Sequence, residues 1–347
     1  MSKPIEAHEL TKENPSFPLT CIDLFAGCGG LSLGLHQAGW EGLFAIERSE
    51  MAFETLQHNL LSAELNHYPH WPDWLPKAAC SIQKLTKSHR QDLVNLRGKV
   101  TLIAGGPPCQ GFSYAGKRQK HDHRNQLYRS YMEVVELVRP KIVLLENVTG
   151  IASGFEKKRP GRLGRPPEPY SKRIERALGK LRYDVRDIEV LASDYGVPQS
   201  RVRFIAVAIN KDEFPEGTQA PDLIKILGDI RISFLASHGL PQDTTVSCRD
   251  ALSDLEYDEK RLADSPDTKK YKAGRFSPAT TGYQKLMRGN IADDVIADSH
   301  RFVKHCPEIV RRFSKIFDEC PRGKNLPYTF RKANGIKKAC IVPLAPN

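Results

Sequence analysis

The strongest constraint on the fold is a repeated alternation of short apolar runs and longer amphipathic stretches. Apolar runs occur at 20–25, 43–46, 100–104 and 142–145, and glycine, proline or polar residues follow each of them. Strands that alternate with helices in this way favour a parallel sheet with crossover helices. We therefore predict an α/β fold with a doubly wound, mostly parallel sheet.

Helix signals lie between these runs. A helix is expected after the first run, through Leu35 and Ala38. Ser49 is a typical N-cap and predicts a helix that continues to about Leu60. A third helix is predicted over 127–138, where apolar residues recur at helical spacing before a proline.

The remaining organisation is predicted from composition. Residues 1–17 are polar and are expected to form a mobile leader. The first domain is predicted to span 18–212 and to contain a basic, proline-rich loop at 156–173. From 213 to 347 the periodic signal weakens, and this part is expected to be a smaller extension. Two further strands are predicted after the loop, at 183–191 and 203–209.

Charge and cysteine content limit the class of protein. Lys and Arg number 52 against 41 Asp and Glu, and the net charge of +11 favours a polyanionic partner, most often nucleic acid. A merely basic soluble protein is the alternative. The eight cysteines form no Cys-x-x-Cys pair, so we expect reduced thiols and no metal site. Without a secretion signal or an apolar stretch of the roughly 20 residues that span a bilayer, a cytoplasmic protein without a membrane partner is predicted.

A glycine-rich turn follows the first apolar run, at a predicted strand-to-helix junction. Glycines there let a ligand approach the backbone, and the start of the helix offers free N–H groups. Glu47 follows 20 residues after Gly27, where a carboxylate receives ribose hydroxyls in nucleotide-binding folds. Ser32 stands where a dinucleotide fingerprint has its third glycine, so an adenosine-like ligand without a pyrophosphate is predicted; a turn needed only for packing is the alternative. The candidate ligand-binding residues are Phe25, Gly27, Gly29, Gly30 and Glu47.

A second motif, Gly105-Gly-Pro-Pro-Cys-Gln-Gly-Phe-Ser113, follows the third apolar run. Prolines stiffen this loop, and its glycines allow tight turns. Cys109 therefore lies at the carboxyl end of a strand, where α/β proteins bind ligands, and its thiolate is a candidate nucleophile. A lone cysteine is more often an inert buried side chain, but a Pro-Pro-Cys-Gln context is too particular for that interpretation.

Two further groups are candidates for the same site. Glu146 ends the fourth apolar run, where a carboxylate can act as an acid beside the cysteine loop; a turn or capping carboxylate is the alternative. Arg201 and Arg203 alternate along a predicted strand and are expected on one face. Two guanidinium groups there suit a phosphate or a polar base edge, although a solvated strand face would look the same.

In this order and spacing, the four motifs resemble the DNA (cytosine-5) methyltransferase family, over Leu19 to about Leu255. The resemblance implies the class I fold of methyltransferases that use S-adenosylmethionine, with this cofactor bound across the Phe25–Gly30 turn and Glu47 on its ribose. It further implies contacts to the cofactor from three more residues: Ile82, Pro108 and Leu127.

The resemblance also implies a mechanism on double-stranded DNA. Cys109 would attack C6 of a cytosine that is flipped out of the duplex, and C5 would then take the methyl group. Glu146 would hydrogen-bond N3 and the exocyclic amine. Arg201 and Arg203 would hold the base and support the cysteine loop.

The sequence departs from the family pattern at two places. Ser81-Ile82 stands where the family usually has Asp-Ile, a pair that meets the adenine amino group. Gly289-Asn290 lacks the valine of the family's closing Gly-Asn-x-Val segment and comes early in the chain. We expect a split or truncated enzyme with an incomplete recognition region, whose missing segments a second polypeptide could supply; a divergent recognition region at 211–347 is the alternative.

Several functions fit these motifs. A DNA cytosine-5 methyltransferase from a restriction–modification system is the leading hypothesis. An RNA cytosine-5 methyltransferase shares the cysteine motif, but such enzymes usually depart from Gln-Gly-Phe-Ser after the cysteine. A catalytically silent DNA-binding subunit is disfavoured because Cys109 and Glu146 are both present. A nicotinamide-dependent dehydrogenase is disfavoured by Ser32 and by the Pro-Pro-Cys loop.

Overall fold

The computed structural model describes residues 18–62, 66–108, 127–152, 168–321 and 323–336. The chain forms two compact units. The first contains the residues up to Ala192 together with Arg201–Ile230, and the second contains Ser193–Ser200 together with the residues from Arg231 onward. The predicted boundary between a first domain at 18–212 and a smaller extension at 213–347 stays a prediction.

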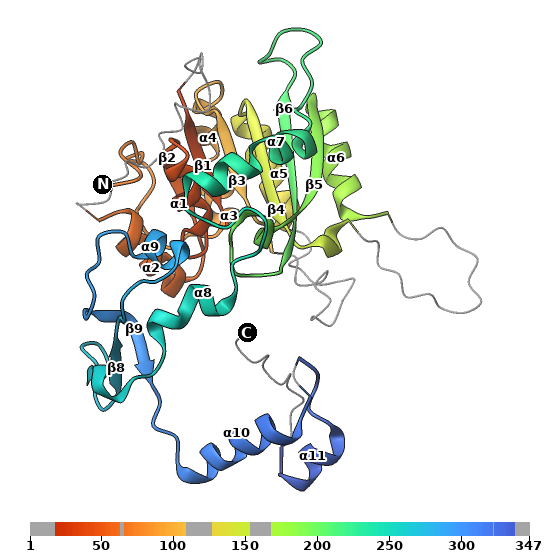
Figure 1. The fold of residues 1–347 in the computed structure, drawn as a ribbon. Helices are drawn as coiled ribbons and strands as arrows, with labels where there is room; N and C mark the ends of the chain where they lie inside the picture. Colours follow the sequence, from red (N-terminus) through yellow and green to blue (C-terminus); the bar gives the residue numbers. More distant parts are fainter. Residues whose placement is uncertain (1–17, 63–65, 109–126, 153–167, 322, 337–347) are drawn as a thin grey trace. The chain divides into compact units, whose positions relative to one another are not determined.

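The first unit is built on a six-stranded sheet with the order β2-β1-β3-β4-β6-β5 (Figure 1). Strands β1 to β4 pair in parallel, whereas β6 runs antiparallel to both β4 and β5. The predicted α/β fold with a mostly parallel sheet is therefore confirmed. The strands are β1 (Thr20–Leu24), β2 (Glu41–Ile46), β3 (Leu102–Gly105), β4 (Ile142–Asn147), β5 (Tyr183–Leu191) and β6 (Val202–Asn210).

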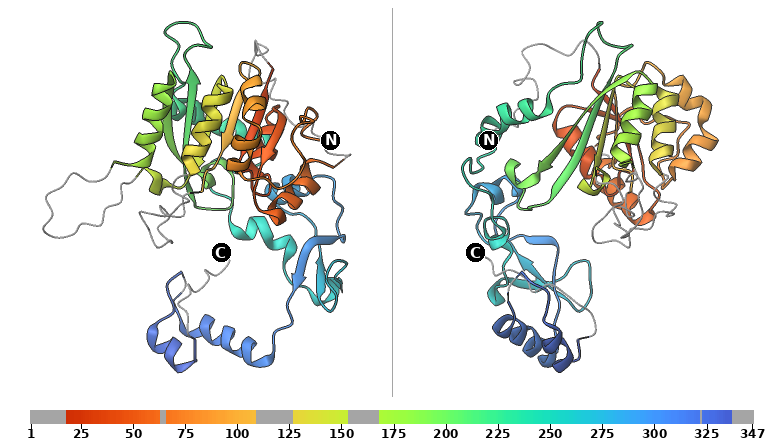
Figure 2. Two further views of the ribbon diagram at one scale, coloured as in Figure 1. Left: turned by 180° about the vertical axis from the view of Figure 1, so that it is seen from behind. Right: turned by 90° about the vertical axis from the view of Figure 1, so that its right-hand side faces the viewer.

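Helices cover both faces of this sheet, as Figure 2 shows from behind and from the side. The helix predicted after Ser49 is confirmed, because the Ser49 hydroxyl accepts a hydrogen bond from the Ala52 amide and the helix ends at Leu60. The helix predicted over 127–138 has those bounds in the structure. The helices of this unit before α7 are α1 (Gly30–Gln37), α2 (Glu50–Leu60), α3 (Ile82–Ser88), α4 (Arg90–Asn95), α5 (Leu127–Val138) and α6 (Tyr170–Lys180), with a 3₁₀ turn η3 (Thr149–Ile151).

Alternation along the strands separates two apolar layers. On β1, Ile22 and Leu24 belong to the large core that α3 to α6 cover, whereas Cys21 packs with Leu35 of α1 on the other face. Tyr131 of α5 is completely buried in the large core, and its hydroxyl lies 3.1 Å from the carbonyl oxygens of both Ile103 and Leu144. This core fixes the carboxyl ends of the parallel strands, which carry the candidate site.

The second unit contains a three-stranded antiparallel sheet with the order β7-β8-β9. Its strands are β7 (Leu262–Asp264), β8 (Lys272–Arg275) and β9 (Ile296–Phe302). Its helices are α8 (Cys248–Leu252), α9 (Gly282–Arg288), α10 (Pro307–Glu319) and α11 (Tyr328–Ala333), with 3₁₀ turns η5 (Ser253–Leu255) and η6 (Glu259–Arg261). The helix α7 (Leu223–Ser237) begins in the first unit and ends in the second. The 3₁₀ turn η4 (Ala192–Tyr195) likewise spans the boundary between Ala192 and Ser193.

No helix in the described part of the chain combines the length and the apolar character that a membrane crossing requires.

Candidate active site

The glycine-rich turn between β1 and α1 has the backbone conformation that its sequence requires. Phe25, Gly27 and Gly29 have φ angles of 63°, 59° and 90°, in the left-handed region. Gly29 is the N-cap of α1, and a Cβ atom there would lie 2.5 Å from Leu60 of α2. Gly29 is therefore needed for packing as well as for its φ angle.

The other two glycines of the turn face open space. A Cβ atom on Gly27 or Gly30 would meet no heavy atom within 4 Å. These two positions therefore leave room beside the backbone at the start of α1, where N–H groups are free of intrahelical partners. This geometry fits a ligand that approaches the turn closely.

Glu47 follows β2 and fastens the turn from the side. Its Oε2 accepts a hydrogen bond from the Gly27 amide at 3.0 Å, and its Oε1 accepts one from the Ser49 amide at 2.7 Å. A carboxylate has about four acceptor sites, so both oxygens can accept further hydrogen bonds from a ligand. Glu47 can therefore hold the turn and bind hydroxyl groups at the same time.

Ile82 is connected to Glu47 through the backbone. The Cys80 amide donates to the Glu47 carbonyl oxygen at 2.7 Å, which brings the segment before α3 to the end of β2. The Ser81 hydroxyl caps α3 by accepting from the Lys84 amide, and Ile82 is 2% exposed in the large core. The side chain that replaces the family's aspartate is thus already used as a helix cap.

The Pro-Pro-Cys loop is anchored at its start by Asn147, which was not predicted as a site residue. The Asn147 side chain is buried, and its Nδ2 donates to the Pro107 carbonyl oxygen at 3.0 Å. Its Oδ1 accepts from the Val148 amide at 2.8 Å. Pro108 is exposed, and Cys109 lies outside the described residues. The sequence Glu146-Asn147-Val148 contains a signal for this role, since an amide that follows an apolar strand is buried there and must find partners for its polar atoms.

Glu146 lies beside the start of the same loop. A Cβ atom on Gly106 would be 2.9 Å from Glu146 Oε2, so only glycine fits there without displacing the carboxylate. On the other side, Arg203 Nε forms an ion pair with Glu146 Oε1 at 2.7 Å. The two side chains are 38% and 24% exposed, so the carboxylate is oriented by the guanidinium and still accessible.

Arg201 and Leu127 are placed differently from these groups. Strand β6 begins at Val202, so Arg201 lies just before the strand and is exposed, and only Arg203 is part of the ladder. Within the described part of the chain, the Arg201 side chain makes neither an ion pair nor a hydrogen bond. Leu127 is the first residue of α5 and packs against the large core.

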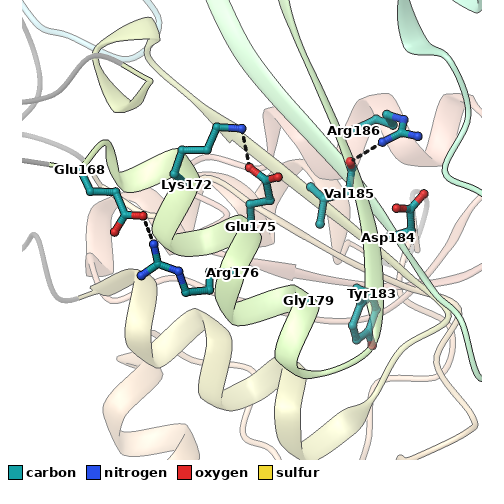
Figure 3. Close-up of a pocket in the computed structure, with 9 residues that line it drawn as sticks. All are labelled: Glu168, Lys172, Glu175, Arg176, Gly179, Tyr183, Asp184, Val185 and Arg186. Carbon is teal, nitrogen blue, oxygen red and sulfur yellow. Dashed lines mark hydrogen bonds and ion pairs between the residues drawn. The ribbon is translucent and has the colours of Figure 1, made fainter.

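A separate open pocket lies along α6 and β5 (Figure 3). Its charged side chains are largely paired with one another: Lys172 Nζ lies 2.6 Å from Glu175 Oε2, and Glu168 pairs with Arg176. None of the predicted site residues lines it, and its mutual ion pairs leave little unbalanced charge for a ligand. Over the described residues, no group of three or more His, Cys, Asp or Glu side chains is placed to hold a metal ion.

Known proteins show similarity over most of this chain. M.AgeI, a type II methyltransferase of Thalassovita gelatinovora, is 36% identical over 278 residues, which are 78% of this chain and 57% of that protein. M.AquIA, a type II methyltransferase of Picosynechococcus sp., is 32% identical over 205 residues, 58% of this chain and 77% of that protein. The chain spans about half the length of several curated relatives it matches, such as M.AgeI and M.DdeI of Desulfomicrobium norvegicum, of which it covers 57% and 41%.

A solved structure supports the fold. A prophage-encoded E. coli protein, described as a DNA modification methyltransferase, superposes with a TM-score of 0.55 at 24% identity over 88% of this chain and 76% of that one. The sequence profile of the C-5 cytosine-specific DNA methylase family matches residues 19–327. A profile match of this extent, together with the glycine turn, the Pro-Pro-Cys loop and the Glu146–Arg203 pair, shows that the chain belongs to the C-5 cytosine-specific DNA methylase family.

Proposed function

We propose that the protein transfers a methyl group from S-adenosylmethionine to C5 of cytosine in double-stranded DNA. One observation carries this proposal: the Glu146 carboxylate is oriented by Arg203 and lies directly beside the loop that leads to Cys109. A nucleophile and an oriented carboxylate at the carboxyl ends of two neighbouring strands are the parts that addition to a pyrimidine ring requires.

The glycine turn fits S-adenosylmethionine, the methyl donor that enzymes of this family and fold use. Gly27 and Gly30 leave open space at the backbone, and the two Glu47 oxygens can accept hydrogen bonds from the ribose hydroxyls. Pro108 and Leu127 would contribute further contacts, together with Phe25 and Gly29. Ile82, whose side chain is 2% exposed, would contribute through its backbone. The cofactor, when bound, supplies an electrophilic methyl group.

The protein's own residues carry the other steps. The Cys109 thiolate forms a bond to C6 of the cytosine, and the electron pair of the C5–C6 double bond makes C5 nucleophilic. A proton shared between Glu146 and N3 forms one hydrogen bond to the base, and Glu146 accepts a second from the exocyclic amine. After C5 has gained the methyl group, loss of the C5 proton to a base restores the double bond and expels Cys109 as a thiolate. Arg203 keeps Glu146 oriented throughout, and Arg201 is available for the base or a phosphate.

The substrate must be extruded from the helix, because a thiolate cannot reach C6 inside a base stack. The net charge of +11 supports binding to the phosphate backbone. Relatives named as type II methyltransferases support a role in restriction–modification.

The test is a covalent trap. Duplex DNA that contains 5-fluorocytosine is incubated with the protein and S-adenosylmethionine, because fluorine at C5 cannot leave as a proton and the Cys109 adduct then persists. We expect a denaturation-resistant complex with the parent and none with Cys109→Ala, which should still bind the cofactor. A complex that persists in Cys109→Ala, or trapping on an RNA duplex and not on DNA, would contradict the proposal.

A further inference from the structure

A buried carboxylate lies directly before the glycine turn. Asp23, the penultimate residue of β1, is 1% exposed. The Ser32 hydroxyl donates to its Oδ2 at 2.5 Å, whereas its Oδ1 is buried without a hydrogen-bond partner among the described residues. Burial raises the pKa of Asp23 to about 7; hydrogen bonds from Ser32 oppose this rise, and the charge of Glu47 adds to it. The predicted function assigns this group no role.

The hydrogen-bond chain continues beyond Ser32. The Tyr68 hydroxyl donates to Ser32 Oγ at 2.7 Å, and Tyr68 is 2% exposed. The ring of Tyr68 packs on Gly42 of β2, where a Cβ atom would lie 2.4 Å from it, and it contacts Trp71 edge-on at 5.5 Å. Tyr68 also shares an apolar cluster with Ala26, a residue of the turn itself.

The turn needs such a restraint. It contains three left-handed residues within five positions, and its N-cap, Gly29, offers no side-chain hydrogen bond to α1. Glu47 fastens the turn to β2 through Gly27. On the helix side, the side-chain connection from β1 to the first turn of α1 is the hydrogen bond between Asp23 and Ser32, the third residue of that helix.

We propose that Asp23, Ser32 and Tyr68 are positioning residues, whose hydrogen-bond chain holds the start of α1 against β1 and so keeps the Phe25–Gly30 turn in the shape that binds S-adenosylmethionine. This inference rests on the proposed function. The three residues act on the cofactor through the turn. The hydrogen-bond chain also explains why a serine stands where a dinucleotide fingerprint has glycine, because the Ser32 hydroxyl links Asp23 to Tyr68.

The test compares two tyrosine variants with the same chemical change. Tyr68→Phe removes the hydroxyl at the end of the hydrogen-bond chain and keeps the ring. Tyr131→Phe removes another buried hydroxyl from the same unit, one that takes no part in this hydrogen-bond chain. Binding of S-adenosylmethionine and of S-adenosylhomocysteine is measured by calorimetry on the full chain, and stability by thermal unfolding. We expect both variants to lose stability, but only Tyr68→Phe to bind more weakly, by about threefold.

Ser32→Ala breaks both hydrogen bonds and should weaken binding by roughly tenfold. Asp23→Asn keeps an acceptor for Ser32 and should retain most of the affinity. At saturating S-adenosylmethionine, kcat should stay within about twofold of the parent in all variants. The reason is that the hydrogen-bond chain affects the affinity for the cofactor and not the methyl-transfer step. If Ser32→Ala does not fold, the tyrosine pair still decides the question.

The outcomes separate the two proposals. A parent protein that binds neither ligand contradicts the proposed function. A parent that binds, together with a Tyr68→Phe variant that binds as tightly as the parent, overturns the positioning inference alone. Equal weakening in Tyr68→Phe and Tyr131→Phe also overturns it, because the loss would then follow general destabilisation.

Discussion

The two units of the molecule are stabilised in different ways. The first has one large apolar core, in which completely buried Ile22, Leu24, Ile103 and Tyr131 pack between sheet and helices. Among its described residues, the second has small apolar clusters, such as Ile316 with its neighbours. Apolar burial is non-directional, whereas a unit with little of it depends on directional contacts.

Arg288 is the centre of those contacts in the second unit. Its side chain is 6% exposed and pairs with Asp254 at 3.7 Å and with Asp293 at 2.7 Å. It also donates to the Ser277 carbonyl oxygen at 2.7 Å and lies 4.5 Å from the centre of the Phe276 ring. The comparison suggests that the first unit tolerates changes of charge outside its site, and that the second does not tolerate them at its centre.

The largest expected effect tests the chemistry of the first unit. Glu146→Gln can still hydrogen-bond the base edge but supplies neither charge nor a proton, and loss of such help costs on the order of 10²–10⁴-fold in rate. Single-turnover methylation of duplex DNA measures the loss. Glu189→Gln, an exposed change on β5 of the same sheet, is the matched control and should keep the parental rate. A parental rate in Glu146→Gln would remove this residue from the mechanism.

The second prediction tests the polar centre of the second unit. Arg288→Met leaves Asp254 buried without its main cation, and breaking a buried pair in this way costs about 3–5 kcal/mol. Urea unfolding, with hydrogen exchange at 231–336, measures the loss and locates it. Arg311→Met, an exposed change on α10, is the control. Replacing both partners, in Asp254→Leu with Arg288→Met, should recover part of the stability; no loss in the single variant would show that apolar contacts suffice there.

The third prediction concerns the buried charge of the first unit. The folded-state pKa of Asp23, about 7, lies above the ordinary value of 3.8, so folding favours its protonated form. This contribution to stability is complete below about pH 4 and is lost as the pH rises to about 7, with a size of about 2–4 kcal/mol. The free energies of unfolding of the parent and Asp23→Asn are compared at pH 5 and pH 8, because other titrations cancel in the difference. The parent should lose stability relative to the variant at pH 8, and an unchanged difference would contradict the assignment.

The smallest expected effect lies at an exposed thiol. Cys248 is the first residue of α8 and is exposed. Surface substitutions without special contacts change the free energy of unfolding by about 0.5 kcal/mol or less. Cys248→Ser should therefore have the parental free energy of unfolding within this range and methylate at the parental rate. Loss of the covalent trap in Cys248→Ser would show that this thiol is needed for the adduct, which the proposed mechanism does not allow.

The same contrast explains what could be predicted from the sequence. The helices at 50–60 and 127–138 were predicted with their bounds because each places an apolar stripe on the large core. Helix α7 was not predicted: only Leu235 is buried among its residues, and apolar side chains such as Ile224 and Ile232 are exposed, so no periodic stripe marks it.

For the site, the sequence identified residue types but not how they are joined. The pairing of Glu146 with Arg203 depends on β6 lying beside β4, with Glu146 opposite Ile205, and this neighbour relation cannot be predicted from local pattern. The anchoring role of Asn147 has the same origin, because Pro107 lies 40 residues earlier in the chain. The side chain of Cys109 and the basic loop at 156–173 keep their predicted roles as predictions.

The interior position of β6 also determines how heat should affect the protein. Glu146 and Arg203 lie on neighbouring strands inside the sheet, and β6 is hydrogen-bonded on both of its edges. Interior strands open only when the whole unit unfolds, whereas edges and loops open locally. We therefore expect backbone amides of β4 and β6 to exchange with solvent only as fast as the unit unfolds. The spacing of the Glu146–Arg203 pair should then stay constant on warming until the sheet itself melts.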